Sequence, residues 1–353
     1  MSLWDASAMK VALLYGPRDV RLGKMDAPRP VDDEVLIKVE SAGVCGSDLH
    51  LYSQGRIGDT VVTEPHVMGH EFCGTVAEMG PKVDGRKVGM RVAVEPSLPC
   101  RKCEFCRIGR YNICPNLRFT GLPPTHGAYA EYIAIPYDFA HPVPETMSAD
   151  EAAMVEPLAV GVHAVELAEM HPEDTVAVLG LGSIGLLTAC VAKLSGAAQV
   201  FGTDLLPYRL DLSRDYGVDV PINAGERNPV QTILEATNGR GVDVVFEAAG
   251  ALETPQQALE IVKPGGTVVM VGIYEREEVP LVFTHGRRKE LVVKWCRRFV
   301  HNFPRAITLA SEGSVALEPL VTHHFPLEKT GEAFELVANY ADGVVKAAID
   351  LRD

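Results

Sequence analysis

The chain has 353 residues, 47% of them hydrophobic and 23% charged, and its formal net charge is −14. This length predicts two domains of ordinary size, and an acidic chain without a basic stripe excludes nucleic acid as an expected partner. No apolar run reaches the roughly 18 residues that span a bilayer, and the N-terminus lacks a signal-peptide pattern. A cytoplasmic protein with no membrane partner is therefore expected.

Short strands with alternating hydrophobicity fill the first third of the chain. They are expected at residues 10–14, 20–22, 34–39, 73–77, 91–94 and 128–135. Glycine and proline residues separate them, as turns require. The N-terminal part is therefore predicted to be a β-rich domain.

Cys45 and His70 are candidate metal ligands within this part of the chain. Each lies beside a glycine that lets the backbone approach a metal, and zinc takes thiolate and imidazole ligands. Taken singly, either residue is more often structural. Glu156 precedes a proline that suits the first turn of an apolar helix, and a carboxylate in that setting needs a partner such as a metal. His163 in the same helix is interpreted as a structural histidine.

Four of the eight cysteines lie close together, at Cys100, Cys103, Cys106 and Cys114. Four thiolates at this spacing can close a tetrahedral shell around one zinc ion, with no open position for chemistry. Disulfides are the alternative, but the tight spacing without a secretion signal favours the metal. We therefore predict a structural zinc site.

Residues 175–204 predict a dinucleotide-binding unit. A strand at 175–179 leads into a glycine turn and a helix to about residue 194, and a second strand ends at Asp204. Gly180 permits the tight turn, Gly182 lets the backbone approach a pyrophosphate, and Gly185 lets helix and strand pack closely. Between these glycines, Ser183 and Ile184 begin the helix and complete the predicted phosphate site.

Asp204 sets the expected choice of cofactor. An acidic side chain at the end of this strand can accept hydrogen bonds from the ribose hydroxyls and would repel a 2′-phosphate. NAD is therefore favoured over NADP. Arg209 leaves the alternative open, because an arginine there can contact either cofactor.

Strands and helices alternate after this unit. Strands are expected at 218–222, 242–246, 266–271 and 290–294, and helices at 229–236 and 254–262. Together with the first two strands, this pattern predicts a doubly wound sheet of six strands. Ligands bind at the carboxyl ends of such strands, so residues 248–250 and the run Val271, Gly272 and Ile273 are predicted to line the cofactor groove.

Beyond about residue 298 the pattern no longer extends this sheet. A helix at 303–311 and strands at 320–323 and 344–350 are expected to rejoin the β-rich domain. His323 and His324 are adjacent on a strand, so their side chains are expected to point to opposite faces rather than to share a metal.

In these motifs the chain resembles the zinc-dependent medium-chain alcohol dehydrogenase family over essentially its whole length. The matching elements are Gly43-Val-Cys-Gly-Ser-Asp48, Gly69-His-Glu71, the four-cysteine lobe, His126-Gly-Ala-Tyr-Ala-Glu-Tyr132 and the glycine turn. The run Val155-Glu-Pro-Leu-Ala-Val-Gly161 is similar to the polyol (sorbitol and xylitol) dehydrogenase branch. The resemblance implies an α/β fold with a Rossmann doubly wound sheet and a β-rich GroES-like catalytic domain.

The domain boundaries implied are 1–157 for the catalytic domain, 158–297 for the NAD-binding domain and 298–353 for the return to the catalytic domain. The resemblance also implies a catalytic zinc near Cys45, His70 and either Glu71 or Glu156. Which glutamate binds the metal directly stays open at this point.

Further roles follow from the resemblance alone. Ser47 and His50 are expected to pass protons to solvent, and Arg298 to contact polyol hydroxyls or nicotinamide. Phe299 departs from the tyrosine that the polyol branch tends to have, and some polyol enzymes lack the full four-cysteine lobe.

The activity implied is reversible, NAD-dependent oxidation of a secondary alcohol of a polyol to the ketose, with zinc as Lewis acid. The alternative enzyme on the same scaffold is an L-threonine or 2,3-butanediol dehydrogenase. A non-enzymatic protein that binds zinc and nucleotide is the alternative from another class. By analogy the protein is expected to be a homodimer or homotetramer, built through edge strands at 279–283 and 290–294.

Overall fold

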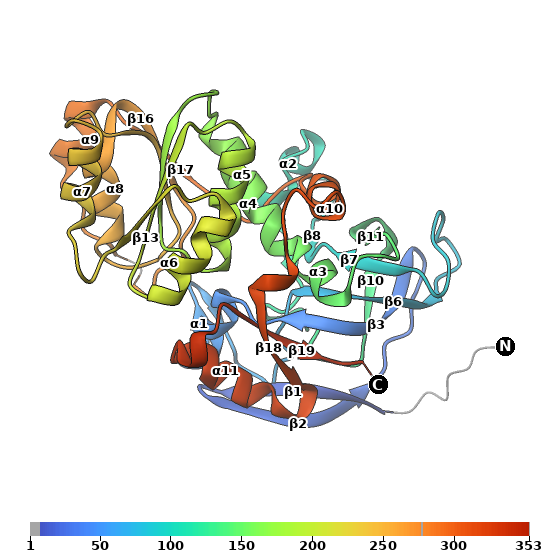
Figure 1. Ribbon diagram of the computed structural model, residues 1–353. Coiled ribbons are helices and arrows are strands. Elements are labelled where there is room, and N and C mark those ends of the chain that lie inside the picture. Colours follow the sequence, from blue (N-terminus) through green and yellow to red (C-terminus); the bar gives the residue numbers. More distant parts are fainter. Residues whose placement is uncertain (1–7, 277, 353) are drawn as a thin grey trace. The chain divides into compact units, whose positions relative to one another are not determined.

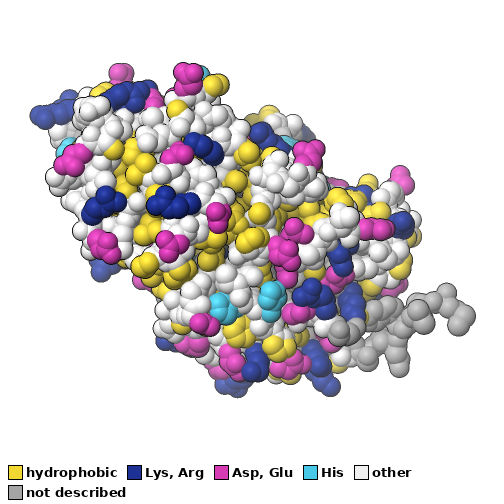
Figure 2. Space-filling model, in the orientation of Figure 1, with side chains coloured by type: hydrophobic (Ala, Val, Ile, Leu, Met, Phe, Trp, Pro, Cys, Tyr) yellow, Lys and Arg dark blue, Asp and Glu magenta, His cyan; other side chains and the backbone are white. Residues whose placement is uncertain are grey.

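The computed structural model describes residues 8–276 and 278–352. The chain divides into two compact units, one formed by Met1–Glu156 with Phe303–Asp353 and the other by Pro157–Asn302 (Figure 1). Each unit has a hydrophobic core of its own. On the face drawn in Figure 2, acidic and basic side chains are interspersed rather than gathered by sign.

The first unit is built on a seven-stranded sheet in the order β11-β7-β6-β3-β19-β18, with β10 paired to β3. These strands are β3 (Glu34–Gly43), β6 (Glu71–Met79), β7 (Arg91–Val94), β10 (Tyr132–Pro136), β11 (Ala140–Pro142), β18 (Val321–Pro326) and β19 (Lys346–Asp350). Along β10 only the alternate residues Ile133 and Ile135 are buried, as expected for a strand with one face on a core.

Smaller sheets and helices complete this unit. The paired strands are β1 (Ala8–Gly16) with β2 (Asp19–Asp26), β4 (Arg56–Ile57) with β5 (Thr60–Val61), and β8 (Ser97–Leu98) with β9 (Arg118–Phe119). The helices are α1 (Gly46–Gln54), α2 (Glu104–Arg107), α3 (Ala149–Ala153), α10 (Phe303–Ser311) and α11 (Thr330–Ala338).

The second unit is a parallel sheet of six strands in the order β14-β13-β12-β15-β16-β17. The strands are β12 (Thr175–Leu179), β13 (Gln199–Asp204), β14 (Val220–Asn223), β15 (Val242–Glu247), β16 (Val262–Met270) and β17 (Val292–Trp295). Every residue of β15 is buried, which is typical of a parallel strand with both faces covered. The predicted doubly wound sheet is confirmed.

The helices of this part of the chain are α4 (Val155–Ala168), α5 (Ser183–Leu194), α6 (Pro207–Ser213), α7 (Pro229–Ala236), α8 (Thr254–Ile261) and α9 (Phe283–Lys289). The start of α7 illustrates how the sequence determines the first residue of a helix. The side chain of Asn228 accepts a hydrogen bond from the backbone N–H of Gln231, and Pro229 occupies the first helical position. Among the described residues, none of the helices has the length and hydrophobicity needed to cross a membrane.

The C-terminus rejoins the first unit as predicted. β19 pairs antiparallel with β3, with Ala348 opposite Gly43, and β18 pairs with β19. His323 and His324 contact different carboxylates, Asp342 at 3.3 Å and Asp150 at 2.9 Å, so they do not form a joint metal site.

Two of the predicted strands differ from the structure. The strand expected at 128–135 begins only at Tyr132, because the backbone N–H groups of Ala128 and Tyr129 bind the carbonyls of Gly69 and Met68 instead of joining the ladder of β3. The edge strand expected at 279–283 is absent from the described residues there. Pro280 has no N–H to donate, the N–H of Val282 binds the side chain of Gln256, and α9 begins at Phe283.

Candidate metal and cofactor sites

Cys45, His70 and Glu71 each place one ligand atom within 4.8 Å of the other two. Cys45 is the N-cap of α1, and His70 and Glu71 lie at the start of β6. His70 and Glu71 are buried, and Cys45 is half-buried. Thiolate, imidazole and carboxylate together are a ligand set that suits zinc with one position left open. Glu156 is also buried, but it does not belong to this group of ligand atoms.

Glycine at position 43 makes room for the carboxylate. A Cβ atom at Gly43 would lie 2.4 Å from Oε2 of Glu71, which is closer than any real contact. Burial raises the pKa of the Cys45 thiol, and the nearby Glu71 raises it further. A bound cation would reverse both effects by favouring the thiolate, so the three residues fit a zinc ion.

The carboxylate of Asp48 contacts the imidazole ring of His70. Its Oδ1 lies 3.3 Å from Nδ1 of His70, while its Oδ2 accepts a hydrogen bond of 2.9 Å from the hydroxyl of Tyr129. Both Asp48 and Tyr129 are fully buried. This contact directs the other ring nitrogen, Nε2, toward Cys45 and Ser47, and the Ser47 hydroxyl lies 3.4 Å from it. A carboxylate in this position fixes the orientation of a metal-binding imidazole.

Lys346, at the start of β19, contacts the third residue of the group, Glu71. Its Nζ is 2.9 and 2.6 Å from the two carboxylate oxygens of Glu71 and donates to the carbonyl of Val44 at 3.2 Å. Burial lowers the pKa of Lys346, but the charges of Glu71 and Cys45 and the hydrogen bond to Glu71 together outweigh burial, and the pKa is raised. Both side chains are almost completely inaccessible, so this is a buried ion pair.

Neither Asp48 nor Lys346 is among the site residues predicted from the sequence. A signal existed for Asp48, because it is acidic and three residues after Cys45, where its side chain accepts from the N-cap N–H of α1. No local signal exists for Lys346, because Glu71 is 275 residues away.

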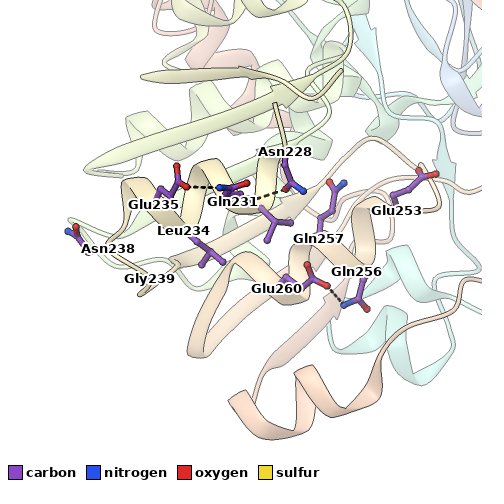
Figure 3. Close-up of a pocket in the computed structure, with 11 residues that line it drawn as sticks. Asn228, Gln231, Leu234, Glu235, Asn238, Gly239, Glu253, Gln256, Gln257 and Glu260 are labelled. Atoms are coloured by element: carbon purple, nitrogen blue, oxygen red, sulfur yellow. Dashed lines mark hydrogen bonds between the residues drawn. The ribbon is translucent and has the colours of Figure 1, made fainter. Parts of the chain in front are cut away.

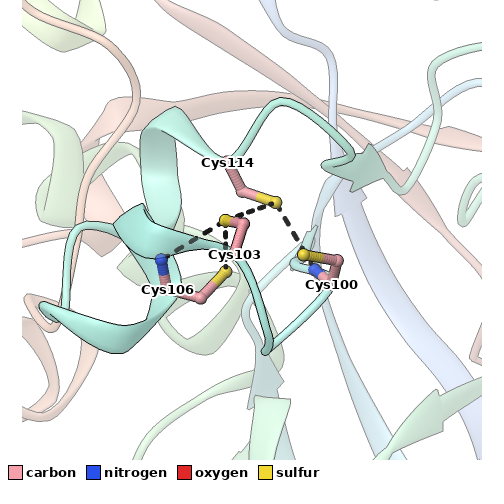
Figure 4. A group of neighbouring side chains, drawn as sticks. All are labelled: Cys100, Cys103, Cys106 and Cys114. Carbon is pink, nitrogen blue, oxygen red and sulfur yellow. Dashed lines mark hydrogen bonds between the residues drawn. The ribbon is translucent and has the colours of Figure 1, made fainter.

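The four cysteines of the lobe converge as predicted (Figure 4). The Sγ atom of Cys103 lies 3.4 Å from that of Cys106 and 3.8 Å from that of Cys114. These separations are far longer than a disulfide bond of about 2.05 Å. They match the edge of a tetrahedron of about 3.8 Å that follows from Zn–S bonds of about 2.3 Å. The backbone N–H groups of Lys102 and Cys103 lower the pKa of the Cys100 thiol to about 6, which favours the thiolate that zinc needs.

The glycine turn joins β12 to α5 and has the predicted geometry. Gly180 has a φ of 92°, and a Cβ atom there would lie 2.6 Å from the Cα of Ala249. A Cβ atom on Gly185 would lie 1.8 Å from the carbonyl oxygen of Gly180. Gly182 is different, because a Cβ atom there would meet only Arg209, at 3.7 Å. Its open surroundings are what a backbone that receives a pyrophosphate requires.

Asp204, at the end of β13, is bonded to this turn. Its Oδ2 accepts from the N–H of Leu181 at 2.8 Å, and its Oδ1 accepts from the N–H groups of Leu205 and Leu206. The guanidinium of Arg209 lies 3.7 Å from Oδ2. Oδ2 accepts one of the two hydrogen bonds that its lone pairs allow, so it remains able to accept a further bond from a ribose hydroxyl.

The other predicted residues lie on several elements. Val271, Gly272 and Ile273 follow β16 at the carboxyl edge of the sheet, and Ile273 is 48% exposed. His50 is half-buried on α1, and Arg298 has a left-handed φ of 56° in the second unit. Phe299 is fully buried.

A separate cleft of about 850 Å³ lies on α7 and α8 (Figure 3). It contains none of the residues predicted for zinc, NAD or substrate. It is lined by Asn228, Val230, Gln231, Leu234, Glu235, Asn238, Gly239, Glu253, Gln256, Gln257 and Glu260.

Known proteins share this architecture. An alcohol dehydrogenase GroES-like domain matches residues 31–145, and a zinc-binding dehydrogenase domain matches residues 183–312. A sorbitol dehydrogenase of Bacillus subtilis (strain 168) is 39% identical over 341 residues, which cover 97% of each chain.

Two solved structures agree. An oxidoreductase of unknown specificity from Escherichia coli is 33% identical with a TM-score of 0.93, over 98% of this chain and 100% of that chain. A 2R,3R-butanediol dehydrogenase from Bacillus subtilis is 31% identical with a TM-score of 0.87, over 98% of this chain and 100% of that chain.

The predicted family and fold class are confirmed by these matches, and NAD with zinc is the cofactor pair expected of such an enzyme. The chain belongs to the zinc-dependent alcohol dehydrogenase family, and sorbitol dehydrogenases from Bacillus subtilis, Mus musculus and Bos taurus are 39%, 38% and 40% identical to it.

Proposed function

We propose that the protein is a zinc- and NAD-dependent dehydrogenase that reversibly oxidises a secondary alcohol of a polyol, similar to sorbitol or xylitol, to the ketose. The observation that carries the proposal is the buried group of Cys45, His70 and Glu71, with Asp48 oriented onto His70. The near full-length similarity to sorbitol dehydrogenases supports the polyol class.

In this proposal Cys45, His70 and Glu71 hold the catalytic zinc, and Glu156 is an alternative ligand or a contact for substrate. When bound, zinc supplies a Lewis acid for the alcohol oxygen and NAD accepts the hydride. The second zinc is held by the four cysteines of the lobe and has a structural role.

The chain's own residues orient the alcohol and move its proton. The Ser47 hydroxyl, 3.3 Å from the sulfur of Cys45 and 3.4 Å from Nε2 of His70, accepts the hydroxyl proton of the substrate. His50, three residues further along α1, passes that proton to solvent. Arg298 contacts polyol hydroxyls or the nicotinamide.

The second unit binds NAD. The turn from Gly180 through Gly182, Ser183 and Ile184 to Gly185 receives the pyrophosphate at the start of α5, where backbone N–H groups and the helix dipole favour an anion. Asp204 accepts from the ribose hydroxyls, with Arg209 beside it. Val271, Gly272 and Ile273 line the nicotinamide end of the groove.

A small diol such as 2,3-butanediol is the second candidate substrate. The similarity to a butanediol dehydrogenase favours it, and so does Phe299, which has no hydroxyl to bond a sugar alcohol. Enzymes for the two substrate classes would use the same proposed zinc and NAD sites and would differ only in the pocket that receives the substrate.

The proposal extends to a homodimer or homotetramer in the cytoplasm. β17 is an edge strand, and its Val292 and Trp295 are 45% and 72% exposed. An exposed apolar edge of this kind is a candidate for strand pairing between copies. Size-exclusion chromatography with light scattering tests this assembly, and a monomer would contradict it. A cytoplasmic setting suits the eight cysteines, all of which are free.

Equilibrium dialysis against NAD, together with a turnover assay, tests the enzymatic role. Cys45→Ser and His70→Ala are expected to abolish NADH production while NAD binding stays near that of the unsubstituted protein. A pure binding protein would retain NAD without producing NADH from any alcohol. Equal loss of binding and turnover in both variants would contradict the division of roles between the two units.

A further inference from the structure

The carboxylate of Glu247, at the end of β15, is buried and accepts four hydrogen bonds. Its Oε1 accepts hydrogen bonds from the N–H groups of Ala249 and Gly250, both at 2.9 Å, and from the hydroxyl of Thr254 at 2.7 Å. Its Oε2 accepts from the hydroxyl of Tyr274. Glu247 is fully buried, so these four donors replace the water that its charge would otherwise require.

Glu247 connects two segments that include the residues predicted to line the cofactor groove, 248–250 and 271–273. One is the turn 248–250 after β15, and the other is the loop 271–274 after β16. The backbone carbonyl of Glu247 also accepts from the N–H groups of Val271 and Gly272, at 2.7 and 2.9 Å. Glu247 therefore holds the start of the loop through its backbone and the end of the loop, at Tyr274, through its side chain.

The packing between the two segments leaves no room for side chains. A Cβ atom on Gly250 would lie 2.4 Å from the carbonyl oxygen of Ile273, and one on Gly272 would lie 2.5 Å from Oε2 of Glu247. The N–H of Ala248 binds the carbonyl of Leu179, at the end of β12, at 2.8 Å. The carboxyl end of β15 is thus hydrogen-bonded to the ends of both neighbouring strands, to β12 through Ala248 and to the segment after β16 through Glu247.

We propose that Tyr274 is a positioning residue for NAD, whose hydroxyl closes the loop 271–274 onto Glu247 and holds the nicotinamide end of the groove in shape. The inference rests on the proposed function. Adenosine is assigned to the side of Asp204 and the glycine turn, so the nicotinamide extends toward the strands on the other side of β12, where this loop lies.

The chemistry of Tyr274 suits a permanent contact. Burial raises the pKa of Tyr274, and the adjacent Glu247 raises it further, so the hydroxyl stays protonated and remains a donor. The loop also presents the half-exposed side chain of Ile273, an apolar surface of the kind that packs against a nicotinamide ring. A loop that is free to move would present this surface only part of the time, and the apparent affinity for the cofactor would fall by that fraction.

Tyr274→Phe tests the inference, because it removes the hydroxyl and keeps the ring. Isothermal titration of the zinc-replete protein would give the Kd for NADH and the Kd for AMP, which has no nicotinamide. We expect the Kd for NADH to rise about tenfold and the Kd for AMP to stay within about twofold, since a 1.4 kcal/mol change corresponds to a factor of ten. Tyr216→Phe is the matched control, because it removes a buried tyrosine hydroxyl from the same unit, in a segment that is not predicted to line the groove.

Amide hydrogen exchange gives a second measurement. NADH is expected to slow exchange at residues 271–274 of the unsubstituted protein, AMP is not, and Tyr274→Phe is expected to speed it. This comparison of ligands remains informative if the variant does not fold.

An unchanged Kd for NADH in a folded Tyr274→Phe variant would overturn the inference alone, as would an equal rise in both Kd values. The same holds if NADH leaves exchange at 271–274 unchanged. Failure of the unsubstituted protein to bind NADH at all would overturn the proposed function, and the inference with it.

Discussion

The Nδ1 atom of His70 lies 3.3 Å from Oδ1 of Asp48, and both side chains are buried. The pair comes from two different elements, α1 and the start of β6, and Tyr129 holds the second oxygen of Asp48. His70 is therefore fixed in orientation before any metal binds. This arrangement fixes the shape of the group formed by Cys45, His70 and Glu71.

Asp48→Asn is expected to weaken zinc binding and lower kcat/KM, each by about 10- to 100-fold, because an amide orients the imidazole less strongly than a carboxylate. Competition with a chromogenic chelator measures the zinc affinity independently of activity. Asp342→Asn is the matched control, because Asp342 lies 3.3 Å from His323 at the exposed surface. Similar effects of the two substitutions would contradict a specific role for Asp48.

Lys346→Met removes the positive partner of Glu71 from a buried site. Since one buried charge is then left without its partner, the metal-free protein is expected to lose about 3–5 kcal/mol of unfolding free energy. Zinc is expected to restore part of the loss, because it supplies positive charge beside Glu71. Urea unfolding with and without zinc measures both effects.

The control for this prediction is Lys82→Met, which breaks an exposed pair with Asp32 at 2.9 Å. It should leave stability almost unchanged under both conditions, as exposed pairs contribute little. A loss in Lys346→Met that zinc does not reduce would argue against a metal beside Glu71.

Cys103→Ser is expected to lower the zinc content from about two ions per chain to about one, since the lobe and the Cys45 group would each hold one. The sulfur atom of Cys103 lies 3.4 Å from that of Cys106 and 3.8 Å from that of Cys114. Atomic absorption gives the count, with Cys190→Ser, a half-buried cysteine outside both groups, as control. An unchanged zinc content would rule out the lobe as a metal site.

His66 makes the first unit sensitive to acid. Burial, with a smaller effect from the neighbouring His126, lowers the pKa of His66 from 6.5 to about 4. Between these two values the unfolded chain binds a proton that the folded protein does not. The contribution of His66 to stability is therefore complete above pH 6.5 and is lost as the pH falls toward 4, at about 1.4 kcal/mol per pH unit.

Urea unfolding at several pH values between 7 and 4 tests this expectation. His66→Leu should flatten the dependence of the unfolding free energy on pH, because the titrating group is gone. His171→Leu is the control, because His171 is exposed and its side chain is 85% accessible. Equal slopes for His66→Leu and the unsubstituted protein would show that His66 is not the source of acid sensitivity.

The sequence predicts the parallel sheet well because its signals are local. The hydrophobic run of β15, the glycine turn before α5 and the proline at the start of α7 each act within a few residues. The four cysteines are predictable for the same reason, since their spacing alone brings the sulfurs together. The strand expected at 128–135 fails because pairing with the loop around Gly69 competes with the sheet for its backbone.

The parts of the site that could not be predicted depend on distant contacts. Lys346 reaches Glu71 only because the final strand returns to β3, and Glu247 joins Tyr274 only because two neighbouring strands end at the same level. The sequence shows the carboxylates of Glu71 and Glu247, but it does not show which side chain will contact each of them.

NADH formation by the zinc-replete protein shows whether a polyol is the substrate. Sorbitol, xylitol, galactitol, threonine, 2,3-butanediol and ethanol would be compared under one set of conditions. We expect the highest kcat/KM for a polyol. A higher kcat/KM for threonine or butanediol would contradict the polyol assignment and leave the proposed zinc and NAD sites in place. Absence of NADH formation with all six compounds would contradict the proposed function.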